Sequence, residues 1–195
     1  HAAVDLHSRL TDEARVLAQR PLLDLPDFKD IAPWFYEWMR RDPTDPWWAW
    51  ADLTTKYPRI DAAVLNLSGW HDEAYGPHGA TTNFMGLTKA RGTTRARTSL
   101  LIGPWVHGVD ATARTRSGER QFGRVSAINY DKVVLDFLDH HVRGIRNDVA
   151  FAAPVRVFVM GANQWRYADR WPLPGLRADT LYFAAGGTLT RSTAS

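Results

Sequence analysis

The sequence contains no cysteine, so it can form neither a disulfide bond nor a metal site built on thiolates. No apolar run approaches the length of about 18 residues that a membrane-spanning helix needs. Lysine is scarce, with 4 residues against 20 arginines, and the arginines are scattered rather than gathered into a phosphate-binding run, although the net charge is +3. These absences predict a soluble protein, cytoplasmic or secreted, with no nucleic-acid and no membrane partner.

The chain does have enough apolar material for a core, because 45% of its 195 residues are hydrophobic and 9 are tryptophan. This length suits one large domain or one and a half small ones. The chain begins at His1 without a methionine or a signal-peptide pattern, and it stops at Ser195 soon after a strand-like segment. We therefore expect a fragment of a longer chain.

Hydrophobic periodicity and proline and glycine breaks divide the chain into elements. The first 46 residues are expected to be helical and irregular, and later segments alternate between strands and helices. The pattern predicts helices at 33–41, 78–90 and 129–142, strands at 62–67, 98–102, 154–160 and 181–183, a turn at 161–163, a polar surface loop at 109–124 and a connection rich in tryptophan and proline at 165–174.

The expected helix at 78–90 connects the expected strands at 62–67 and 98–102, which makes a βαβ unit. The crossover of such a unit is right-handed, and its two strands are therefore parallel. Gly103-Pro104 is expected to end the second strand. Parallel strands end at the same edge of a sheet, where open α/β sheets place their functional side chains. Asp72 and His107, 35 residues apart, follow the two strands and are expected to meet there.

A carboxylate beside an imidazole can orient the ring, fix its tautomer and stabilise the imidazolium that forms when the ring takes a proton. The order of acid and then histidine is that of α/β-hydrolases, in which the serine comes first. Glu73 is a rival acid, but Asp72 follows the Gly-Trp-His bend directly and has the shorter side chain. A purely structural pair remains an alternative, and the spacing of His71, Asp72 and His78 fits no strong zinc pattern.

Several motifs together resemble the CocE/NonD family of hydrolases, which includes relatives of cocaine esterase, X-Pro dipeptidyl-peptidases (S15), glutaryl acylases and α-amino acid ester hydrolases. The likeness runs from about Trp47 to the end of the chain. It rests on Gly69-Trp70-His71-Asp72, Gly103-Pro104-Trp105-Val106-His107-Gly108, Phe122-Gly123, the helix end Phe137–Gly144, Pro154–Gly161, and Trp165 to Pro174.

The resemblance implies an α/β fold: the C-terminal half of an α/β-hydrolase core, with its parallel βαβ unit, preceded by cap helices and followed by the start of a β-sandwich, or jelly roll. The corresponding domains are the end of a helical cap at 1–46, the core at 47–147 and a truncated sandwich at 148–195. The resemblance also implies a Ser-Asp-His triad, with Asp72 as the orienting acid and His107 as the general base. Trp70, Trp105 and Tyr75 are candidates for the substrate pocket, and neither a cofactor nor a metal is implied.

The chain departs from the family pattern in lacking a Gly-x-Ser-x-Gly nucleophile elbow. The sequence thus predicts part of a serine hydrolase that cleaves esters, amides or short peptides through an acyl-enzyme, and a fragment that is inactive alone. The acids that α-amino acid ester hydrolases carry beyond the triad acid are missing, which disfavours that subfamily. The alternative function is a non-catalytic relative used for binding or assembly, and homo-oligomer formation stays open.

Overall fold

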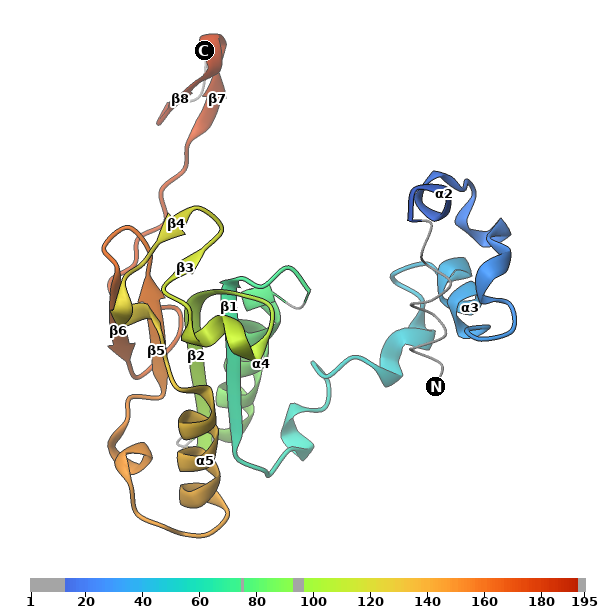
Figure 1. Ribbon diagram of the computed structural model, residues 1–195. Coiled ribbons are helices and arrows are strands. Elements are labelled where there is room, and N and C mark those ends of the chain that lie inside the picture. The colour runs from blue at the N-terminus through green and yellow to red at the C-terminus, as the bar shows by residue number, and fades with distance from the viewer. Residues whose placement is uncertain (1–12, 75, 93–96, 193–195) are drawn as a thin grey trace. The chain divides into compact units, whose positions relative to one another are not determined.

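The computed structural model describes residues 13–74, 76–92 and 97–192 (Figure 1). The chain divides into two compact units, one up to Asp52 and one from Leu53, and each is described by itself. No helix of the described residues is long and apolar enough to cross a membrane.

The first unit is built of short helices. Five buried side chains form its core, Val16, Leu25, Phe28, Ala32 and Tyr36, and the Tyr36 hydroxyl donates to the carbonyl of Leu25. The helix predicted at 33–41 is confirmed by α3. The elements are α2 (Glu13–Ala18), α3 (Trp34–Arg40) and the 3-10 helices Leu22–Asp24, Pro26–Phe28 and Pro46–Trp50.

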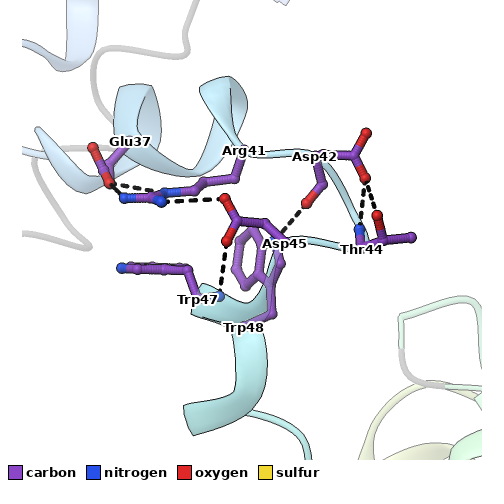
Figure 2. Close-up of polar contacts among 7 residues, drawn as sticks. All are labelled: Glu37, Arg41, Asp42, Thr44, Asp45, Trp47 and Trp48. Carbon is purple, nitrogen blue, oxygen red and sulfur yellow. Dashed lines mark hydrogen bonds and ion pairs between the residues drawn. The ribbon is translucent and has the colours of Figure 1, made fainter.

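Arg41 ties the end of α3 to the next helical turn (Figure 2). Its guanidinium donates to Glu37 and, at 3.2 Å, to Asp45, and it lies 5.0 Å from the centre of the Trp47 ring. Asp45 caps the 3-10 helix by accepting from the Trp47 backbone N–H at 2.8 Å. The Trp47 amide and Arg41 together hold the pKa of Asp45 below its ordinary value.

The second unit contains a four-stranded sheet in the order β1-β2-β5-β6. Strands β1, β2 and β5 are parallel, and β6 runs antiparallel to β5. Helix α4 connects β1 to β2, which confirms the predicted βαβ unit. The bounds are β1 (Val64–His71), α4 (Gly76–Arg91), β2 (Thr98–Val106), α5 (Tyr130–His141), β5 (Val155–Val159) and β6 (Gln164–Ala168), with 3-10 helices at Tyr57–Arg59, Val109–Ala113, Arg124–Ser126 and Asp148–Phe151.

Two apolar clusters cover the two faces of this sheet, with α4 behind it and α5 in front of it in Figure 1. Because side chains alternate along a strand, neighbouring residues of β2 serve different faces. Leu100 and Ile102 pack with Phe84 of α4, whereas Leu101 packs with Leu65, Leu67 and Val133 of α5. Asn129 caps α5 by accepting from the backbone N–H of Lys132 at 3.0 Å.

The structure differs from the sequence prediction in several segments. Strand β2 continues through Gly103-Pro104, which was expected to end it, and β6 occupies part of the connection expected at 165–174. Both β5 and β6 extend the sheet of β1 and β2. The polar stretch 109–124 includes a hairpin of β3 (Arg116–Ser117) and β4 (Arg120–Gln121), and a second hairpin joins β7 (Tyr182–Ala184) to β8 (Thr188–Thr190) across a turn at Ala185–Gly187.

Arg91, at the end of α4, joins the segments that lead into both strands of the βαβ unit. Its guanidinium donates to the carbonyls of Ile60 and Ala62 before β1, and to Arg97 O and Thr98 Oγ1 at the start of β2. We expect Arg91→Met to lower the free energy of unfolding by about 2 kcal/mol, since several acceptors lose a charged donor. Urea unfolding measures the free energy, with Lys89→Met in the same helical turn as the control. An equal, small loss of stability in both variants would contradict the role given to Arg91.

Candidate active site

Asp72 and His107 meet at the carboxyl edge of the parallel sheet, as the βαβ unit predicts. His107 Nδ1 lies 3.1 Å from Asp72 Oδ1, and the Asp72 side chain is 12% exposed against 47% for His107. An ionised carboxylate can only accept a hydrogen bond, so Nδ1 carries the proton and its N–H donates a hydrogen bond to Asp72. This bond leaves the lone pair of Nε2 to accept a proton from another group.

An irregularity between β1 and β2 brings these two residues level. The strands pair residue for residue as far as Gly69 and Gly103, but beyond that point His71 pairs with Val106. Strand β2 thus holds one extra residue, a β-bulge, before the histidine. Without it Asp72 would lie level with Val106, and His107 would point to the other face, because a slip of one residue exchanges the faces.

Two glycines make room for this bulge. A Cβ on Gly69 would lie 2.1 Å from the carbonyl oxygen of Trp105, and a Cβ on Gly103 would lie 2.4 Å from the Trp105 ring. Pro104, between Gly103 and Trp105, has no N–H to donate, and proline inside a sheet is confined to edges and bulges. The sequence Gly103-Pro104-Trp105 therefore continues the strand in a distorted form.

A shallow pocket opens beside the pair. Its lining includes Asp72, His107, Gly108 and two residues that sequence reasoning missed, Thr112 and Tyr130. Tyr130 is the first residue of α5, directly after the capping residue Asn129. The N-terminal capping residue Asn129 predicts where α5 begins, but only the fold brings that end of α5 to the pocket.

The three candidate pocket residues have different outcomes. Trp105 contributes to the pocket lining, but it is only 2% exposed, and Trp70 donates from Nε1 to the carbonyl of Phe158 at 2.7 Å while its ring packs near Trp171. Packing accounts for both indoles, and their roles toward a substrate remain predictions. Tyr75 lies outside the described residues. Within the described ranges, no three histidine, aspartate or glutamate side chains gather to hold a metal ion.

Comparison with known proteins identifies the family of the chain. The profile of the X-Pro dipeptidyl-peptidase family (S15) matches residues 4–109, more than half of the chain. The chain belongs to this family. Cocaine esterase of Rhodococcus sp. (strain MB1 Bresler), a similar protein, is 27% identical over 194 residues, which are 97% of this S15-family chain and 32% of the esterase. The chain thus spans about a third of that relative.

Two solved structures share the fold of this S15-family chain. An aminopeptidase from the marine sediment archaeon Thaumarchaeota archaeon superimposes with a TM-score of 0.64 over 76% of this chain and 24% of its own, at 22% identity. An α-amino acid ester hydrolase gives a TM-score of 0.68 over 83% of this chain and 27% of its own, at 23% identity. At these identities the likeness shows the α/β hydrolase-like fold alone.

Proposed function

We propose that this chain supplies the acid and the general base of a serine hydrolase that cleaves ester or amide bonds through an acyl-enzyme. The observation that carries the proposal is the bond of 3.1 Å between His107 Nδ1 and Asp72 Oδ1, with the carboxylate largely buried and the ring half-exposed beside a pocket. Membership of the S15 family and the likeness to an esterase support the same reaction class.

In this mechanism His107 Nε2 removes the proton of a serine hydroxyl as its oxygen attacks the substrate carbonyl. Asp72 holds the ring and stabilises the imidazolium. His107 then gives the proton to the leaving alcohol or amine, which leaves an acyl-enzyme. Water attacks the acyl group in the second half, with His107 taking the proton of the water and returning it to the serine oxygen.

The nucleophile and the oxyanion donors are proposed to lie outside these 195 residues. No nucleophile elbow is present in the sequence, and Ser68 is buried inside β1. The chain covers about a third of cocaine esterase, which leaves room in a longer polypeptide for both parts. The end of the cap at 1–46 remains a proposal of the same kind. So does the start of a jelly roll in 148–195, where β5 and β6 pair with the core sheet instead.

The 195-residue chain is therefore expected not to turn over p-nitrophenyl acetate, since removal of the nucleophile leaves little acyl transfer. A longer polypeptide that contains it should hydrolyse this ester and bind a fluorophosphonate covalently. The chain with His107→Ala is the control for slow, non-enzymatic attack by imidazole.

Labelling of the short chain by the fluorophosphonate would place the nucleophile inside it and overturn this part of the proposal. Absence of both labelling and hydrolysis in the longer polypeptide would instead favour a non-catalytic relative that binds or assembles. Esters and short peptides should both be offered as substrates, because the relatives include an esterase and an aminopeptidase.

A further inference from the structure

Trp105 lies two residues before His107 and is held from three sides. Its ring covers Gly103, it is 2% exposed, and it packs 5.9 Å from the ring of Trp165. Its Nε1 donates to the carbonyl of Ser126 at 3.0 Å. The side chain is therefore anchored to a turn that is distant in sequence from the strand that carries it.

That turn, residues 123–126, is itself fixed. Ser126 is fully buried, and both its backbone N–H, at 3.1 Å, and its hydroxyl, at 2.8 Å, donate to the carbonyl of Gly123. A second indole, Trp165, donates to the neighbouring carbonyl of Val125 at 2.7 Å. Two tryptophans from β2 and β6 thus hold successive carbonyls of one turn.

The side chain of His107, by contrast, is 47% exposed. The Asp72 bond and the backbone that leaves the bulge both contribute to the position of its ring. The backbone carbonyl of Trp105 passes directly over Gly69, within the bulge that sets the alignment of Asp72 and His107. The contacts that fix Trp105 therefore also fix the alignment of Asp72 with His107.

We propose that Trp105 is a positioning residue, which holds the bulge of β2 against the 123–126 turn so that His107 stays level with Asp72. The expected effect of Trp105 on kcat rests on the proposed function, whereas its effect on the alignment of His107 with Asp72 does not. Positioning gives the buried indole a role other than lining an acyl pocket.

The test uses Trp105→Phe, which keeps an aromatic ring but removes the donor to Ser126. Trp48→Phe is the matched control, because it removes an indole bond of the same length, to the carbonyl of Asp42, from a tryptophan of the first unit. The spectroscopic readout on the 195-residue chain is the ¹⁵N signature of the neutral His107 ring. Trp105→Phe should lower the population of the Nδ1–H tautomer, whereas Trp48→Phe should leave it unchanged.

In an active longer polypeptide, Trp105→Phe should lower kcat by about 10-fold with KM nearly unchanged, as the loss of one hydrogen bond of about 1.4 kcal/mol would. A rise in KM at constant kcat would identify Trp105 as a pocket residue and overturn the proposal. If Trp105→Phe fails to fold, Ser126→Ala, which removes the hydroxyl bond to Gly123 but keeps the backbone bond, should shift the tautomer in the same direction. An unchanged tautomer in the folded variants refutes positioning, and an inactive wild type refutes only the proposed function.

Discussion

Replacing Asp72 with asparagine is expected to lower kcat about 10,000-fold in a polypeptide that also carries the nucleophile. The carboxylate accepts from His107 Nδ1 at 3.1 Å, whereas an asparagine can present its NH₂ group to that nitrogen. The ring then favours the proton on Nε2, the atom that must accept one from serine. The charge that stabilises the imidazolium is lost at the same step. Steady-state hydrolysis of p-nitrophenyl acetate measures the effect.

Glu73→Gln is the matched control, because it removes the neighbouring carboxylate, the rival acid by sequence, from an exposed position. We expect it to change kcat less than about 2-fold, as surface substitutions usually have small effects. An equal loss in both variants would mean that general negative charge, rather than the Asp72 bond, supports the histidine. A large loss in Glu73→Gln alone would transfer the role of the acid to Glu73.

The βαβ unit and the meeting of Asp72 with His107 can be predicted because local signals and a handedness rule suffice for them. Apolar runs around Leu65 and Leu101 mark the strands, the stretch that contains Phe84 and Leu87 marks the helix, and a right-handed crossover makes the strands parallel. Two residues that follow such strands must reach the same edge. The family motifs at Gly69 and Gly103 agree with this reasoning but are not needed for it.

The bulge cannot be predicted in this way, because its cause lies in the neighbouring strand. Gly103-Pro104 is a typical strand end when β2 is considered alone. The strand continues because Gly69 of β1 leaves space for the Trp105 carbonyl and because Ser126, 21 residues later, accepts from the indole. Strand β6 escapes prediction for a related reason: its residues are mostly exposed, and pairing with β5 rather than apolar alternation defines it.

Gly69→Ala is expected to destabilise the second unit by about 3 kcal/mol, at the upper end of overpacking costs. The new Cβ would lie 2.1 Å from the carbonyl oxygen and 2.7 Å from the carbonyl carbon of Trp105. These are backbone atoms, so no side-chain rotation relieves the clash, and β2 must move away from β1. A displacement of about 1 Å at the reacting groups can cost about 100-fold in rate, so kcat should fall with the stability.

Gly79→Ala provides the control, since Gly79 lies within α4 and a Cβ there would meet nothing within 4 Å. Alanine has the higher helix propensity, so this variant should raise the free energy of unfolding by up to about 1 kcal/mol. Urea unfolding, followed by tryptophan fluorescence, should show a lower free energy of unfolding for Gly69→Ala and a higher one for Gly79→Ala. A Gly69→Ala chain with wild-type stability and an unchanged His107 tautomer would show that the strands can pair without this close approach, and the alignment of Asp72 with His107 would then need another cause.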